Sequence, residues 1–272
     1  SSGLEFYLVP DFNNVTGKTY YMALSQAFFS LSLGMGAIIT YGSYISKSDN
    51  IITSAALVTT ADALIAFMAG LLIFPLVFFQ GIEPTEGPGL VFVSLPGIFE
   101  AMGPVLGKIV GGGFFLLLCF AALTSTVSLL EVPTAYVTDE TNFSRKKAVV
   151  GLAALVFILG LPSMLGQGAV PFFTEFITYG GQTKSFMGMI IDVFSDIGLP
   201  LGGFLISIFV AYRWRTHRAA DEIEQGYEHF RGSWGDKFFN VVISYVSPIV
   251  VGMMVIIIFL NKFTGLDILG GL

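Results

Sequence analysis

Long apolar stretches constrain what this chain can fold into more than any other feature. Six of them are long enough for a hydrocarbon core about 30 Å thick, which takes about 20 helical residues. None alternates apolar and polar residues as a strand does, and a backbone in lipid must satisfy its own hydrogen bonds, so helices are expected. We predict an all-α integral membrane protein with a single transmembrane domain over residues 1–272. The predicted spans are about 20–45, 51–80, 108–138, 147–165, 185–212 and 237–261.

The charged-residue content supports a membrane protein and argues against a nucleic-acid-binding protein. Only 12% of the residues are charged, against about a quarter in soluble domains, which leaves too little polar surface to face water. The net charge of −6 argues against a nucleic-acid partner, which needs a basic surface. Membrane lipid is the expected surrounding.

Lysine and arginine are distributed unevenly between the loops. One set of alternate loops contains nine of these residues and the other set contains four. Because cytoplasmic loops are enriched in lysine and arginine, the first set is expected in the cytoplasm and both ends of the chain outside. The Gly/Pro-rich loop 81–107 is then extracellular. Outside ends without a signal peptide predict an odd number of further helices upstream.

One acidic residue falls deep inside a predicted span. Asp62 lies about twelve residues into the second span, next to Thr59 and Thr60. An intramembrane carboxylate needs a cation, a proton or hydrogen-bond donors, and oxygen ligands suit sodium. We favour a cation site, and a protonated structural aspartate is the alternative.

The third span carries a cluster of hydroxyl groups. Ala121, Ser125 and Leu129 stand at i, i+4 and i+8, so they share one helix face, and Thr124 lies beside them. Such hydroxyls form sites, but they also bond back to their own helix or join two helices. Glu131 is a second candidate for a buried acid.

The first span contains Gly34-Met35-Gly36 at its middle. Two glycines favour a break in the helix, and discontinuous helices at mid-membrane expose carbonyls and helix ends to ions and substrates. A groove for close helix packing is the alternative.

Enzyme chemistry is not indicated. His217 and His229 both fall in the charged loop 213–236, away from the spans. The sequence contains no zinc-protease, nucleophile-elbow or phosphate-loop motif.

Several segments resemble one transporter family. Residues 26–44, from Gln26 to Tyr44, closely resemble the sixth transmembrane helix of the neurotransmitter:sodium symporter family, which includes the bacterial leucine transporter. Similar matches are 87–96 to the fourth extracellular loop, 123–126 to the eighth helix, 144–147 to the turn before the ninth, and 199–203 to the tenth. The resemblance implies the C-terminal portion of an inverted-repeat fold, helices six to eleven, with a broken first helix and with helices one to five missing.

The resemblance also implies the substrate and ion sites. Sodium is the expected coupling ion, and the substrate is an amino acid or a related small amine. The implied substrate-binding residues are Phe29 (an aromatic lid), Ser30, Ser32, Met35, Ser125 and Leu129. The implied sodium ligands are Ser30 and Asp62 for one ion, and Ala121, Thr124 and Ser125 for the other. Chloride-dependent relatives carry a serine where this chain has Ala66, so no chloride requirement is predicted.

Gate residues follow from the same resemblance. The implied gate residues are Phe29 and Asp192 on the outer side, with Asp196 as a competitor for Asp192, and Tyr44 and Asp139 on the cytoplasmic side. The predicted function is sodium-coupled symport across the cell membrane by alternating access. A membrane amino-acid sensor, a channel-like subunit and a structural membrane subunit are the alternatives.

Overall fold

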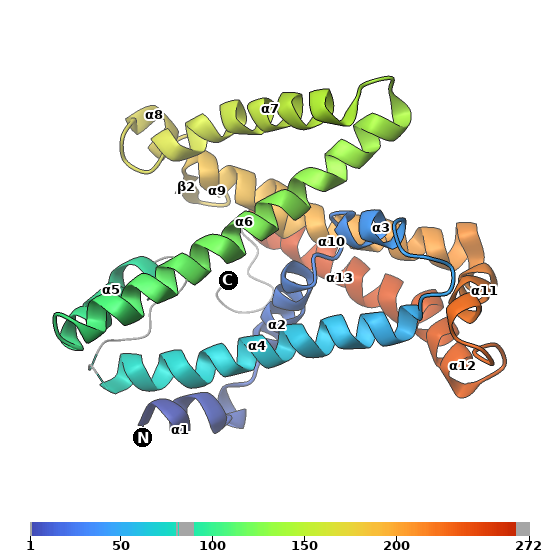
Figure 1. Cartoon of the computed structure of the whole chain (residues 1–272), viewed down its shortest axis with the longest axis horizontal. Helices are drawn as coiled ribbons and strands as arrows, with labels where there is room; N and C mark the ends of the chain where they lie inside the picture. Colours follow the sequence, from blue (N-terminus) through green and yellow to red (C-terminus); the bar gives the residue numbers. More distant parts are fainter. Residues whose placement is uncertain (1, 80, 82–89, 265–272) are drawn as a thin grey trace. The chain divides into compact units, whose positions relative to one another are not determined.

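The fold is mostly helical. The computed structural model describes residues 2–79, 81 and 90–264. Five of its helices are long and apolar enough to cross a membrane (Figure 1). They comprise α4 (Ile51–Phe79), α6 (Leu106–Glu140), α7 (Arg145–Leu165), and the continuous helices Phe186–Gly226 and Trp234–Thr264. These five correspond to five of the six predicted spans, with ends shifted by a few residues except at Gly226.

The remaining predicted span, 20–45, is divided between two helices. α2 (Gly17–Ser30) ends within it, and α3 (Ala37–Gly42) begins after six intervening residues. Thr16 and Thr19 form a capping box at the start of α2. Residues 31–36 between the two helices form turns.

The two last long helices change their winding along their length. The first joins α9 (Phe186–Ile190), α10 (Gly198–Ile208) and α11 (Thr216–Gly226) through two π-helical segments, η3 (Ile191–Ile197) and η4 (Phe209–Arg215). The second joins α12 (Trp234–Val241) and α13 (Ser247–Phe259) through η5 (Val242–Val246), and it ends in η6 (Leu260–Thr264).

Shorter elements lie between the long helices. Within the predicted extracellular loop 81–107 the chain forms η2 (Leu90–Ser94) and α5 (Leu95–Ala101), so part of that loop is helical, while 82–89 falls outside the described residues. After α8 (Pro171–Thr174), β1 (Ile177–Tyr179) pairs antiparallel with β2 (Gln182–Lys184). The sequence analysis did not predict this hairpin, because three-residue strands are too short to show alternation.

The chain divides into two compact units. Unit 1 comprises residues 1–14 and 57–128, which include α1 (Ser2–Leu8) and η1 (Phe12–Asn14). Its core is formed by the buried side chains of Val77, Leu95, Ile98 and Phe99. Tilted and edge-to-face ring contacts of Phe99 with Phe114 and Phe115 join α5 to α6.

Unit 2 comprises residues 15–56 and 129–272. Its main core joins α2 to α10 and α13, which lie side by side (Figure 1), through Phe28, Val251, Met254 and Ile258. A second core joins α11 to α12 through Ala220, Ile223, Phe230 and Phe239.

Candidate functional site

The interruption between α2 and α3 is held in a conformation that depends on glycine. Gly34 and Gly36 have φ angles of 82° and 84°, in the left-handed region, and Ser32 has a φ of 53°. Leu33 N donates to Phe28 O at 2.9 Å, which closes the last turn of α2. Within the described part of the chain, no backbone N–H donates to the carbonyls of residues 31–35. These oxygens are therefore available for a cationic group.

The interruption is pressed against the backbone of α10. A Cβ atom added to Gly34 would lie 2.0 Å from the carbonyl oxygen of Leu199, and one added to Gly202 would lie 2.2 Å from the carbonyl oxygen of Gly34. A Cβ at Gly203 would meet the ring of Phe28 at 2.4 Å. The small residues that resemble the family's tenth helix thus allow the turn and α10 to touch backbone to backbone.

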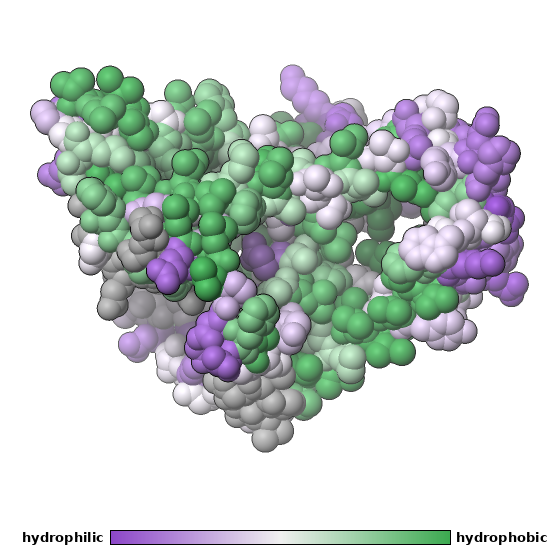
Figure 2. Space-filling view, turned by 90° about the horizontal axis from the view of Figure 1, so that it is seen from below, coloured by the Kyte–Doolittle hydropathy of each residue, from purple (hydrophilic) through white to green (hydrophobic). Residues whose placement is uncertain are grey.

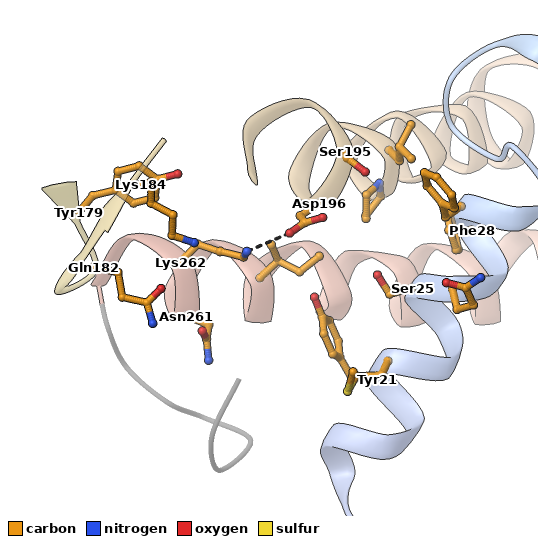
Figure 3. Close-up of a pocket in the computed structure, with 17 residues that line it drawn as sticks. Tyr21, Ser25, Phe28, Tyr179, Gln182, Lys184, Ser195, Asp196, Asn261 and Lys262 are labelled. Atoms are coloured by element: carbon orange, nitrogen blue, oxygen red, sulfur yellow. Dashed lines mark ion pairs between the residues drawn. The ribbon is translucent and has the colours of Figure 1, made fainter. Parts of the chain in front are cut away.

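A cavity of about 690 Å³ lies beside this contact in unit 2 (Figure 3). The side chains of Tyr21 and Ser25 reach it from α2, and those of Asn261 and Lys262 from η6. Phe29, the predicted lid, also lines it. The cavity therefore presents aromatic surface together with charged groups of both signs.

The acidic residues of η3 are paired with lysines of this same chain. Asp192 is 3% exposed, and its carboxylate contacts Lys262 Nζ at 2.5 Å and Lys184 Nζ at 2.7 Å. Lys262 also contacts Asp196 at 2.9 Å, as the dashed line in Figure 3 marks. Both acids that the sequence analysis weighed for the outer gate thus share one lysine. The sequence did not identify Lys184 or Lys262 as partners of these acids. The signal that could have found them is their position next to the ends of the predicted spans 185–212 and 237–261.

Tyr179 of the hairpin completes this cluster. Its hydroxyl group donates to Asp192 Oδ2 at 2.7 Å. Burial, together with that hydrogen bond to a carboxylate, raises the pKa of Tyr179 to about 12. The phenol remains a hydrogen-bond donor at any ordinary pH. We call Tyr179, Lys184, Asp192, Asp196 and Lys262 the lysine cluster.

A second charged cluster forms around Glu131. Arg145 Nη2 lies 2.7 Å from both oxygens of the Glu131 carboxylate. The hydroxyl group of Tyr44 donates to Glu131 Oε1 at 2.6 Å. These residues follow α3, lie within α6 and begin α7, so the cluster ties three segments together. We call Tyr44, Glu131 and Arg145 the arginine cluster.

The arginine cluster contains Glu131, whereas the predicted cytoplasmic gate contains Asp139 as its acidic residue. The sequence analysis assigned Tyr44 and Asp139 to the gate, and the structure pairs Tyr44 with Glu131. Asp139 is exposed and forms no ion pair with any residue in the described ranges. Glu131 had been noted only as a candidate buried acid, and Arg145 as part of a basic turn.

The predicted ligands of the second sodium ion lie one helical turn apart on α6. Thr124 Oγ1 donates to the carbonyl oxygen of Ala121 at 2.9 Å, which brings the two oxygens together. Each oxygen retains a lone pair after this bond forms, so both remain able to contact a cation. Ser125 follows directly on the same helix, and all three residues are exposed in this chain.

The predicted site residues are divided between the two units. Asp62 is half-buried on α4 in unit 1, and Met35 is half-buried in the interruption in unit 2. Unit 1 contains Asp62, Ala121, Thr124 and Ser125. Unit 2 contains Phe29, Ser30, Ser32, Met35, Tyr44, Leu129, Asp139 and Asp192.

Comparison with known proteins identifies the family. The profile of the sodium:neurotransmitter symporter family matches residues 1–268. An uncharacterized sodium-dependent transporter of Bacillus subtilis, YhdH, is 34% identical over 259 residues, which are 95% of this chain and 54% of that protein. The sodium-dependent serotonin transporter of Drosophila melanogaster is 28% identical over 266 residues, 91% of this chain and 38% of that protein.

A solved structure agrees. The crystal structure of MhsT in complex with L-phenylalanine matches with a TM-score of 0.81 at 40% sequence identity, over 96% of this chain and 56% of that chain. The chain thus spans about half the length of YhdH and of MhsT. The resemblance predicted from the sequence is confirmed, and the chain belongs to the sodium:neurotransmitter symporter family of multi-pass membrane transporters.

Proposed function

We propose that this chain forms one part of a sodium-coupled symporter for an amino acid or a related small amine. The observation that carries the proposal is the interruption at residues 31–36, which packs against α10 and in which the carbonyls of residues 31–35 accept no hydrogen bond from a described backbone N–H. Carbonyl oxygens at a helix break can hold an ammonium group or a sodium ion in lipid surroundings. α2 and α3 then form one broken transmembrane helix, the first of six.

The substrate pocket is proposed around this break. Ser30, Ser32 and Met35 belong to the break or its edge, and Phe29 lines the cavity from α2. The family resemblance also assigns Ser125 and Leu129 of α6 to the binding of the substrate's side chain. Support for an amino acid comes from MhsT, which was solved with L-phenylalanine.

Sodium is proposed as the co-transported ion at two sites. The paired oxygens of Ala121 and Thr124, with the hydroxyl of Ser125, suit a hard cation at one site. Ser30 and Asp62 supply ligands for the other. The carboxylate of Asp62 offsets the charge of sodium, so transport should not require chloride.

Alternating access supplies the proposed mechanism. The cell membrane holds the protein with both chain ends outside, so the arginine cluster lies on the cytoplasmic side and the lysine cluster on the outer side. Helices supplied by the rest of a longer protein complete the ion and substrate shells. Arg145 and Tyr44 release Glu131 when the cytoplasmic side opens, and the break moves relative to a fixed wall of helices.

Uptake by the complete transporter in proteoliposomes tests the proposal. We expect uptake of radiolabelled L-phenylalanine or L-leucine that needs a sodium gradient and persists when gluconate replaces chloride. Gly34→Ala should abolish uptake, because the added methyl group meets the carbonyl of Leu199. Gly42→Ala is the matched control, since nothing lies within 4 Å of the added atom.

The ion site has its own variants. Thr124→Val keeps the shape of the side chain but removes the hydroxyl oxygen, so it should raise the sodium concentration for half-maximal uptake at least about tenfold. Thr124→Ser should restore the value. Uptake that does not depend on sodium would contradict the proposal and favour a channel-like subunit, and substrate binding without uptake would favour a sensor. A fully active Gly34→Ala variant would contradict the role assigned to the interruption.

A further inference from the structure

One face of α12 is apolar, exposed and continuous with a membrane span. Trp234, Phe238 and Val241 stand at i, i+4 and i+7 and are 78%, 56% and 54% exposed. The rings of Trp234 and Phe238 stack with centroids 5.2 Å apart and an interplanar angle of 15°. The same helix continues into Tyr245 and Ile249, which are also exposed. The stripe therefore runs without a break from the helix start into the part that crosses the membrane.

The opposite face of α12 is already occupied. Phe239 packs against Ala220, Ile223 and Phe230, the core between α11 and α12. Ser233 caps the helix by accepting a hydrogen bond from Asp236 N, and Asp236 in turn accepts one from Gly232 N. The orientation of α12 within unit 2 is thus fixed, and its aromatic face is exposed.

Unpaired cations lie at the same end of the helices. Lys237 lies between Trp234 and Phe238 on α12, and Arg213 and Arg215 end η4. None of these three forms an ion pair with another residue in the part of the chain that the structure describes.

Two hydrogen bonds keep these cations beside α12 and η5. Tyr212 donates to the carbonyl oxygen of Ser244 at 2.8 Å, and Thr216 donates to Asn240 Oδ1 at 2.7 Å. The cations at the end of η4 are therefore anchored next to the helix that bears the aromatic stripe. Hydrophilic side chains gather over α11 and α12 (Figure 2), so this end of the long helices is where they leave an apolar environment.

We propose that Arg213, Arg215, Trp234, Lys237 and Phe238 form a binding surface for anionic phospholipid headgroups. Tryptophan prefers the boundary between headgroups and acyl chains, because its ring is apolar and its N–H needs a polar partner. Lysine and arginine at that depth attract acidic lipids, which concentrate in the cytoplasmic leaflet. The Lys/Arg distribution predicts that this end faces the cytoplasm.

Lipid fits these observations better than a protein partner. The apolar stripe does not end at the edge of a patch but passes into the span at Tyr245 and Ile249, which are also exposed. Three cations with no acid partner need counter-charges of the opposite sign, and phosphate groups lie at that level of a bilayer. The inference does not depend on the proposed transport activity, because lipid binding can be measured without substrate.

Quenching of Trp234 by brominated lipid tests this surface in the complete protein. The protein is reconstituted into phosphatidylcholine with a minor fraction of phosphatidylglycerol, with bromine on one lipid or on the other. Subtracting the signal of Trp234→Phe isolates Trp234 from Trp214 and from any further tryptophan. We expect quenching by the brominated phosphatidylglycerol in excess of its share of the bilayer, a preference of roughly tenfold.

Charge removal separates the site from general attraction. Arg213→Gln, Arg215→Gln and Lys237→Gln together should lower the preference from roughly tenfold to close to one. The matched control removes the same charge from exposed residues elsewhere in the chain, Lys47→Gln, Lys146→Gln and Lys147→Gln, and should keep the preference.

Three outcomes would overturn the proposal. Quenching by each lipid in proportion to its share of the bilayer would show an aromatic anchor without a site for acidic headgroups. Quenching by aqueous iodide but by neither lipid would place Trp234 in water. Protection from iodide and from both lipids would show that protein covers the surface.

Discussion

The lysine cluster and the arginine cluster have similar compositions but differ in how deeply their charged groups are buried. Each pairs a carboxylate with a tyrosine hydroxyl and with basic side chains. Asp192 is almost fully enclosed and contacts two lysines whose side chains are 21% and 27% exposed. Glu131 meets a single arginine whose side chain is 63% exposed.

The difference in burial predicts different roles: the lysine cluster is a permanent structural contact, which we call the anchor, and the arginine cluster is a contact that can open. Breaking a buried pair leaves an uncompensated charge in the interior, which is strongly destabilising. An exposed arginine loses little when it leaves its acid, because water replaces the contact. The lysine cluster is suited to fix the hairpin and η6 to η3, whereas the arginine cluster is suited to open and close repeatedly.

The largest expected effect comes from removing the enclosed acid. Asp192→Asn leaves Lys184 without a carboxylate and Lys262 with only Asp196, so the free energy of unfolding should fall by about 3 kcal/mol. Thermal unfolding in detergent, followed by circular dichroism, measures this loss. The matched control is Asp221→Asn, which removes an exposed partner of Arg231 and should cost less than about 0.5 kcal/mol. Equal losses in the two variants would remove the distinction between anchor and surface pair.

The two lysines of the anchor should not be equivalent. Lys262 contacts Asp192 and Asp196, while Lys184 contacts Asp192 alone among the acids that the structure describes. Lys262→Met should therefore lower the free energy of unfolding by about 2 kcal/mol and Lys184→Met by about 1 kcal/mol. A double-mutant cycle of Lys262→Met with Asp192→Asn measures their coupling. An additive double variant would mean that the contact contributes nothing to stability.

Salt should separate the two clusters more clearly than mutation alone. At about 0.02 M ionic strength, Glu131→Gln should lower the unfolding temperature by only about 2 °C, and at about 1 M the difference should vanish through screening. The loss in Asp192→Asn should persist at both concentrations, because enclosed pairs are screened much less. A Glu131→Gln effect that survives high salt would make the arginine cluster a second anchor.

The helices and the acidic residues of the two clusters could be predicted from the sequence, but the residues that pair with those acids could not. Five long helices could be predicted because about 20 apolar residues in a row have few alternatives to a membrane helix. Gly34 and Gly36 signalled the interruption, because glycine adopts left-handed backbone without strain. The pairing of Asp192 with Lys262 could not be predicted, because the two residues are 70 positions apart and meet only through packing of α10 against α13. The hydrogen bond from Tyr44 to Glu131, in place of the predicted partner Asp139, likewise depends on the position of the segment after α3 relative to α6.

The smallest effect concerns Tyr179, and it tests how enclosed the anchor is. Its pKa of about 12 lies above the usual 10, so the phenol stabilises the fold fully below pH 10, and this contribution is lost as the pH rises through 12. The difference in tyrosinate absorbance between the wild type and Tyr179→Phe should therefore begin only above about pH 11. In the Asp192→Asn background the onset should move toward pH 10, because the carboxylate that opposes ionisation is gone. If the onset is unchanged in that background, burial alone raises the pKa of Tyr179, and Asp192 contributes little to it.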